Sequence, residues 1–248
     1  MNLLSDWLGE KIYQYDSIDS TQAQAEKLAQ AGASHGTVIC AREQLAGRGR
    51  LGRSWHSAAD KGVWLSIIIR PQFQIDHLPQ ITLLSSLAIR QTLEQLYDLD
   101  TQVKWPNDIY FEHSKLGGIL TQARINTGRI EYAILGIGLN TDQTTFPENL
   151  LAKPISIEEA IGYSPDKQEL MSRLLSEIAD LYNEYEVRGF MPFLTQYLEN
   201  LYGKDELVMV DNQLVGKISG VNHRGELILI DKAEVEHIVA SGEIKFKR

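Results

Sequence analysis

The sequence predicts an α+β protein whose main part is a mixed, largely antiparallel sheet with helices, followed by a small β-rich unit. Strand-like and helix-like periods alternate along the first part of the chain. The later strand-like runs leave little room between them for crossover helices, which favours hairpins over parallel pairs. From about Gly203 the pattern changes to short β-rich runs separated by turn residues.

The N-terminal part begins with a strand and a capped helix. Lys11 to Ser17 alternates like a short strand, and Ser20 can cap a helix that continues until Gly32 ends it. Gly36 to Ala41 and Gly62 to Ile69 are also strand-like. The second of these runs is too continuously apolar for an exposed edge, so we expect it to be buried.

A long helix and a hairpin form the middle of the chain. Leu78 to Tyr97 places apolar side chains at helical spacing, which predicts an amphipathic helix that faces the core. Gly117 to Ile125 and Arg129 to Leu139 are two strand-like runs joined through Asn126-Thr127-Gly128. This arrangement predicts an antiparallel hairpin.

Helices return before the C-terminal unit. Ser156 and Glu159 form a capping-box pattern, and Asp166 to Tyr185 carries an apolar stripe. The β-rich runs that follow are Glu206 to Val210, Leu214 to Val221, Glu226 to Ile230 and Val235 to Val239. They suggest a small barrel-like module, so we expect two domains, residues 1–202 and 203–248.

Composition limits the class of function. Hydrophobic residues make up 43% of the 248 residues, and the net charge of -9 opposes non-specific attraction to nucleic acid. No apolar stretch approaches the roughly 18 residues needed to span a bilayer. The single cysteine, Cys40, lies in an apolar run and cannot form an intramolecular disulfide. We therefore expect a cytoplasmic protein without a nucleic-acid or membrane partner.

The most informative segment runs from Gln44 to Trp55, where glycine and arginine alternate between Gly47 and Arg53. Glycines let the backbone approach a ligand closely, and the planar fork of arginine suits phosphate and carboxylate. An anionic ligand is implied. Taken alone, the segment also fits a flexible surface loop or a loop that contacts RNA, and it matches neither the Walker pattern nor the dinucleotide-binding glycine pattern.

Two later clusters combine charge, amide and glycine. Lys104-Trp105-Pro106-Asn107-Asp108 is followed by Lys115-Leu116-Gly117-Gly118-Ile119-Leu120, a mixture that suits adenosine phosphate. Trp105 taken alone favours a core position, and Asp108 with Lys115 could form a solvated pair. The third cluster, Gly136-Ile137-Gly138-Leu139-Asn140, taken alone favours a strand end with a turn.

The order of these clusters resembles the biotin–protein ligase family across nearly the whole chain. Asp19-Ser20-Thr21-Gln22 precedes the three clusters, and Ala240-Ser241-Gly242-Glu243-Ile244 resembles the family's closing stretch. The resemblance implies a class II synthetase-like biotin/lipoate ligase fold with a C-terminal SH3-like β-barrel. It also implies ATP-dependent formation of biotinyl-5'-AMP with release of pyrophosphate, then transfer of biotin to a lysine of a biotin carboxyl carrier domain of acetyl-CoA carboxylase.

The resemblance also implies roles for individual residues. The implied binding residues are Ser20, Thr21, Gln22, Gln44, Gly47, Arg48, Gly49, Arg50, Trp55, Asn107, Lys115, Gly118 and Asn140. Ser20, Thr21 and Gln44 would hydrogen-bond the ureido head of biotin, whereas Gln22 stands where the family commonly has asparagine. Lys115, Arg50 and Arg48 are the expected catalytic residues, within a lid formed by residues 47–55. Asp108 is expected to help hold Mg²⁺.

Two rival functions share parts of the pattern. A lipoate–protein ligase would use the same activation chemistry, and a biotin-responsive repressor would add an N-terminal DNA-binding domain. Because Asp19-Ser20-Thr21 begins after only 18 residues, too few for a helix-turn-helix domain, we expect a monofunctional ligase. A β-rich binding module without catalysis would leave the basic clusters unexplained. The sequence leaves two oligomeric states open, a homodimer through exposed strand edges and a monomer.

Overall fold

The computed structural model describes residues 7–148 and 150–247, and it contains two β-sheets. The strands of the larger sheet lie in the order β1 (Ile12–Ile18), β2 (Val38–Gln44), β3 (Gly62–Ile69), β7 (Arg129–Asn140), β6 (Ser114–Asn126), β5 (Asp108–Phe111) and β4 (Gln102–Lys104). Within it β1 pairs with β2 in parallel, and every other neighbouring pair is antiparallel. The predicted mixed, largely antiparallel sheet is confirmed.

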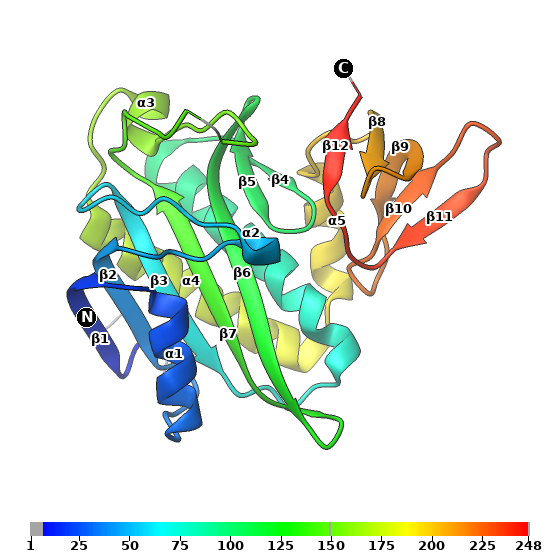
Figure 1. Cartoon of the computed structure of the whole chain (residues 1–248). Helices are drawn as coiled ribbons and strands as arrows, with labels where there is room; N and C mark the ends of the chain where they lie inside the picture. Colours follow the sequence, from blue (N-terminus) through cyan, green and yellow to red (C-terminus); the bar gives the residue numbers. More distant parts are fainter. Residues whose placement is uncertain (1–6, 149, 248) are drawn as a thin grey trace.

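Helices cover both faces of this sheet (Figure 1). The helices are α1 (Thr21–Gln30), α2 (Leu78–Tyr97), α3 (Ile157–Ile161), α4 (Lys167–Arg188) and α5 (Met191–Glu199), with short 3-10 turns η1 (Arg50–Gly52) and η2 (Ile75–His77). Helix α1 packs on one face, where Ala25 and Ala29 contact Ile39 and Ile68 in a small core cluster. Helices α2 and α4 pack against each other on the opposite face and bury the main core.

Local sequence explains where the predicted elements begin and end. The side chain of Ser20 accepts a hydrogen bond from the backbone N–H of Ala23 (3.4 Å), so α1 begins where predicted. The β6–β7 hairpin turns at Thr127 and Gly128, whose φ angles of 47° and 76° are those of a tight hairpin turn. The capping box at Ser156 and Glu159 starts α3.

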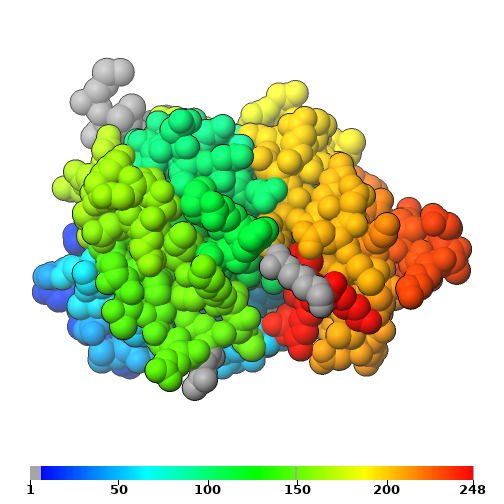
Figure 2. Space-filling model, turned by 90° about the horizontal axis from the view of Figure 1, so that it is seen from above, coloured from blue at the N-terminus to red at the C-terminus, as the bar shows by residue number. Residues whose placement is uncertain are grey.

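The C-terminal residues form a five-stranded antiparallel sheet. Its order is β11 (Glu236–Val239), β10 (Leu227–Ile230), β9 (Leu214–Val221), β8 (Leu207–Val210) and β12 (Ile244–Phe246). Trp105 Nε1 donates to the carbonyl of Gly225 (2.9 Å), and Gln80 donates to the carbonyl of His223 (2.9 Å), so the β9–β10 turn is fixed to the larger unit. The C-terminal segment lies beside the rest of the chain in Figure 2. The division into two domains and the SH3-like closure stay predictions.

Strands β5 and β12 and helix α5 were not predicted, and each is short. The two strands have four and three residues, fewer than a reliable period of two requires, and α5 carries Pro192 in its first turn. Trp105 is 2% exposed, which confirms the core position that it favours when taken alone, and Cys40 in its apolar run is 6% exposed. Within residues 7–148 and 150–247, no helix combines the length and the hydropathy that crossing a bilayer requires.

Replacing Leu87 with alanine tests the core between α2 and the sheet. Leu87 is 0% exposed, and its truncation leaves a cavity, so we expect the free energy of unfolding to fall by about 3 to 5 kcal/mol. Urea denaturation measures this change. Val187→Ala is the control, because Val187 on α4 is 85% exposed and its loss should change stability by less than about 0.5 kcal/mol. Similar losses for the two variants would contradict this packing.

Candidate active site

A cavity of about 740 Å³ opens beside strands β4 to β7 of the larger sheet. Its volume is within the range of small-molecule sites. The predicted residues that line it are Thr21, Gln22, Gln44, Arg48, Gly49, Arg50, Trp55, Asn107, Asp108, Lys115, Gly118 and Asn140. Segments from five separate parts of the chain therefore meet around one space.

Two of the predicted binding residues do not line the cavity. Ser20 is 2% exposed and caps α1, so it sets the position of its neighbour Thr21. Gly47 is the first residue of residues 47–55, which we call the Gly-Arg segment. It is buried, and a Cβ added to it would lie 2.4 Å from the carbonyl oxygen of Trp55. Because Gly47 has no Cβ, the backbone at Trp55 can approach it closely, and the Trp55 N–H donates to the Gly47 carbonyl (2.8 Å) and closes the loop.

One end of the cavity is a buried polar network. Gln44 Oε1 accepts hydrogen bonds from the backbone N–H of Thr21 (2.8 Å) and from its hydroxyl (3.0 Å). Gln44 Nε2 donates to Ser57 Oγ (2.8 Å), and Ser66 Oγ lies 2.9 Å from the Thr21 hydroxyl. Ser66 also donates to Gln22 Oε1 (3.2 Å). Amide and hydroxyl groups are therefore held in fixed positions where a polar ring could exchange hydrogen bonds with them.

Glycines of β6 and β7 form the floor of the cavity. A Cβ at Gly138 would lie 2.5 Å from Trp55 Nε1, and one at Gly118 would lie 3.2 Å from the same ring. Because these positions lack side chains, the indole of Trp55 packs directly on the sheet. The Trp55 Nε1 is buried and has no hydrogen-bond partner among the described residues. The Lys115 ammonium lies 5.1 Å from the centre of the Trp55 ring, within cation–π range.

Cations and one carboxylate occupy the middle of the cavity. Lys115 Nζ lies 2.7 Å from Asp108 Oδ1, and the two side chains are 23% and 18% exposed. Arg50 Nη1 donates to Asn107 Oδ1 (2.8 Å), while Asn107 Nδ2 donates to Asp108 Oδ1 (3.1 Å). Burial lowers the pKa of Arg50, and the nearby carboxylates of Asp108 and Glu243 oppose this effect only in part. The cluster would therefore be stabilised by an anionic ligand.

The Gly-Arg segment is tied to the C-terminal sheet by two arginines. Both Nη atoms of Arg53 donate to the Glu243 carboxylate, at 2.8 and 2.7 Å, and Arg50 Nη2 donates to the carbonyl of Gly242 (3.3 Å). The hydrogen bond from Arg53 lowers the pKa of Glu243. We define this contact, Arg53 with Glu243, as the latch. It couples residues 47–55 to the stretch that precedes β12.

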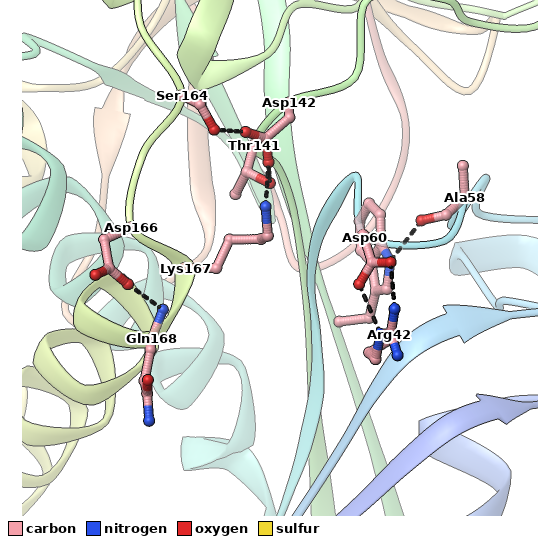
Figure 3. A network of polar contacts seen from close by, with 10 residues as sticks. Arg42, Ala58, Asp60, Thr141, Asp142, Ser164, Asp166, Lys167 and Gln168 are labelled. Carbon is pink, nitrogen blue, oxygen red and sulfur yellow. Dashed lines mark hydrogen bonds and ion pairs between the residues drawn. The ribbon is translucent and has the colours of Figure 1, made fainter.

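The end of β7 is fixed by one ion pair and two hydroxyl hydrogen bonds just beyond Asn140 (Figure 3). Lys167 Nζ donates to Asp142 Oδ2 (2.6 Å), Thr141 Oγ1 donates to the same oxygen (2.7 Å), and Ser164 donates to the other. Burial raises the pKa of Asp142, but these hydrogen bonds outweigh it and the pKa lies below its ordinary value. Asn140 Nδ2 in turn donates to the carbonyl of Ile155 (3.0 Å), which positions the loop before α3.

Sequence reasoning missed part of the cavity wall. Phe146, Leu150 and Leu151 line it from the loop after β7, and residues 242–246 line it from the C-terminal sheet. Ser66 was also missed, although a single serine inside the apolar run Gly62–Ile69 is a usable signal of a buried polar function. The loop residues carried no comparable signal, because their apolar side chains follow no period.

The sequence is similar to those of known proteins. The family model described as the biotin/lipoate A/B protein ligase family matches residues 15–140. The bifunctional ligase/repressor BirA of Bacillus subtilis is 32% identical over 244 residues, which cover 96% of this chain and 75% of that protein. The biotin--[acetyl-CoA-carboxylase] ligase of Paracoccus denitrificans is 28% identical over 236 residues, which cover 92% of this chain and 97% of that protein.

A solved structure shares the arrangement of the whole chain. The biotin protein ligase from Aquifex aeolicus, in complex with biotin and ATP, superimposes with a TM-score of 0.84 at 27% sequence identity. The match covers 96% of this chain and 99% of that protein. Both the larger sheet and the C-terminal sheet are therefore within the shared fold.

Replacing Glu243 with glutamine tests the latch. The variant keeps the shape of the side chain but removes the ion pair, which is worth up to about 1 kcal/mol for partly exposed groups. We expect trypsin to cut within residues 48–53 up to about fivefold faster, because the detached population of the loop increases.

The matched control for this experiment is Glu236→Gln on β11, where the side chain is exposed. The control should be cut at the wild-type rate and should keep the wild-type urea midpoint, whereas the free energy of unfolding of Glu243→Gln should fall by no more than about 1 kcal/mol. Unchanged cutting of Glu243→Gln would show that the latch does not hold the Gly-Arg segment.

Proposed function

The chain belongs to the biotin/lipoate A/B protein ligase family, and from this premise we propose that it is a biotin–protein ligase. It joins biotin to ATP as biotinyl-5'-AMP and releases pyrophosphate, then passes the biotinyl group to a lysine of a carrier protein. The observation that supports this function most strongly is that one cavity contains both the polar network at Thr21 and Gln44 and the cations Lys115 and Arg50.

The polar network suits the ureido ring of biotin. A cyclic urea offers one carbonyl acceptor and two N–H donors, and the Thr21, Gln44 and Ser66 side chains carry both donors and acceptors. Binding a ring without polar atoms would exclude water from these groups and leave their remaining donor and acceptor positions unpaired, which costs about 1 to 3 kcal/mol for each position. This favours biotin over lipoate, whose dithiolane ring has no matching donors or acceptors.

The first half-reaction needs positive charge beside the reacting phosphate. One oxygen of the biotin carboxylate attacks the α-phosphorus, the bond from that phosphorus to the bridging oxygen breaks, and pyrophosphate leaves with the electron pair. Lys115 and Arg50 supply fixed charge near the phosphoryl oxygens, where negative charge is spread in the transition state. Arg48 at the cavity wall would add to this field.

The second half-reaction breaks the mixed anhydride. The amine of the acceptor lysine attacks the acyl carbon, AMP leaves with the bonding electrons, and the amine loses one proton to give the amide. Because water would hydrolyse the anhydride, a closed Gly-Arg segment protects it until the carrier arrives. The contacts of Arg50 and Arg53 with residues 242–243 support residues 47–55 as that lid.

Magnesium would enter this site together with ATP. Within residues 7–148 and 150–247, there is no group of three or more His, Cys, Asp or Glu side chains that could hold a metal ion. Mg²⁺ commonly takes one carboxylate, substrate phosphates and water, and Asp108 in the cavity can provide that carboxylate. The ion would neutralise phosphate charge.

An acceptor, a location and an assembly complete the proposal. We propose the biotin carboxyl carrier domain of acetyl-CoA carboxylase as acceptor, in keeping with the name of the Paracoccus relative, and the cytoplasm as the location. Strand β1 is an edge of the larger sheet and exposes Ile12 and Tyr13, so it is one candidate surface for a homodimer.

Transfer of labelled biotin tests the proposed function. The protein is incubated with radiolabelled biotin, ATP and a carrier domain, and label is expected on one lysine of the carrier only when ATP is present. Labelled lipoate in the same assay tests which acid the enzyme prefers, and it should give at least about 100-fold less product than biotin. Equal use of lipoate, or label without ATP, would refute the proposal.

Replacing Lys115 with alanine tests the cation of the first half-reaction. We expect pyrophosphate release to slow by about 10² to 10³, the usual cost of losing one charge-stabilising group. Lys217→Ala is the control, because Lys217 is exposed on β9 outside the cavity. Near-normal pyrophosphate release by Lys115→Ala would remove this residue from the centre of the mechanism.

A further inference from the structure

Lys104 is a cation of the cavity to which the steps above give no role. It ends β4 and lines the cavity, and its side chain is partly buried. Its ammonium lies 5.3 Å from the centre of the Tyr110 ring and 5.5 Å from that of Phe246 on β12. Across the described parts of the chain, this ammonium makes no ion pair or hydrogen bond of its own.

Aromatic rings hold an ammonium without using its N–H donors. A cation–π contact is an attraction to the ring face, so the three donors of Lys104 stay available to a ligand in the cavity. Burial lowers the pKa of Lys104, and the nearby charge of Lys115 adds to this effect, whereas Asp108 and Glu243 oppose it. An anionic ligand beside the ammonium would offset the free-energy cost of burying this charge away from water.

The sheet order arranges the polar residues of the cavity in a row. Asn140 lies on β7, Lys115 on β6, Asp108 on β5 and Lys104 on β4, and these strands are consecutive neighbours. Lys104 and Asp108 are register partners, and Asp108 pairs with Lys115. Lys115 is the register partner of Tyr110 rather than of Asp108, so the two lysines lie two strands apart and are also offset along the strands. The Asp108 carboxylate on the intervening strand β5 reaches Lys115 through its side chain.

We propose that Lys104 binds the β- and γ-phosphates of ATP, the part that leaves as pyrophosphate. This inference rests on the proposed function and extends it. With the α-phosphate at Lys115, as in the proposed reaction, the remaining phosphates extend toward the next free cation of the cavity, Lys104 on β4. When the bond to the α-phosphorus breaks, pyrophosphate takes the electron pair, and Lys104 stabilises the added negative charge.

The proposal separates the two half-reactions. Pyrophosphate is present in adenylation but absent from transfer, so Lys104 should matter for the first and not for the second. Lys104→Met keeps an unbranched side chain against the two rings and removes only the charge. The rate of adenylation, measured as the release of pyrophosphate, should fall by about 10². In the reverse reaction, the pyrophosphate concentration for half-maximal ATP formation should rise at least about tenfold.

Transfer from supplied biotinyl-5'-AMP to the carrier domain is the internal control, and the Lys104→Met rate should stay within about twofold of wild type. Lys217→Met is the matched control for removing a lysine charge outside the cavity, and it should leave all three measurements unchanged. Phe246→Leu removes one bracing ring but keeps the charge, so a smaller loss, again confined to adenylation, is expected.

The outcomes separate this proposal from the proposed function. Equal losses of adenylation and transfer in Lys104→Met would show a general structural role and overturn the proposal, as would adenylation at the wild-type rate. If the wild-type protein itself made no biotinyl-5'-AMP, the proposed function would fail before Lys104 is tested. Circular dichroism and the urea midpoint establish that each variant folds.

Discussion

The structure of the site depends on the bare glycine surface of β6 and β7. A side chain at Gly136 or Gly138 would collide with Gln22 or Trp55, since an added Cβ would come within 2.4 or 2.5 Å of their polar atoms. Only because these positions lack a Cβ can Trp55 lie on the sheet, where its ring is then close to the Lys115 ammonium. The polar pocket, the indole and the cation are therefore neighbours for one steric reason.

A second constraint is that the cavity wall comes from both sheets. The C-terminal sheet is fixed on one side by the hydrogen bond from Trp105 to Gly225, and it contacts the Gly-Arg segment on the other through Glu243 and Gly242. The same stretch leads into β12, whose Phe246 braces Lys104. The C-terminal sheet is thus part of the site's geometry, and a shift of this sheet would move several cations together.

Much of the fold could be predicted because its longer elements have strong periods. The bounds of α2 match the predicted helix, and the β6–β7 hairpin was predicted from its turn residues. Residue types and their order indicated most of the cavity lining, since glycine, arginine and lysine patterns carry chemistry. Pairings between distant segments could not be predicted: Arg53 and Glu243 are 190 positions apart, and neither residue signals the other. The apolar loop near Phe146 likewise has no local pattern that points to a cavity.

A crystal structure with a non-hydrolysable analogue of biotinyl-5'-AMP tests the central claim most directly, namely that one glycine-floored cavity holds both the acid and the nucleotide. The account predicts the ureido ring beside Thr21 and Gln44, and the group that links acid to nucleotide within about 3 Å of Lys115 Nζ. An analogue bound elsewhere, or one whose linking group lies away from both Lys115 and Arg50, would contradict it.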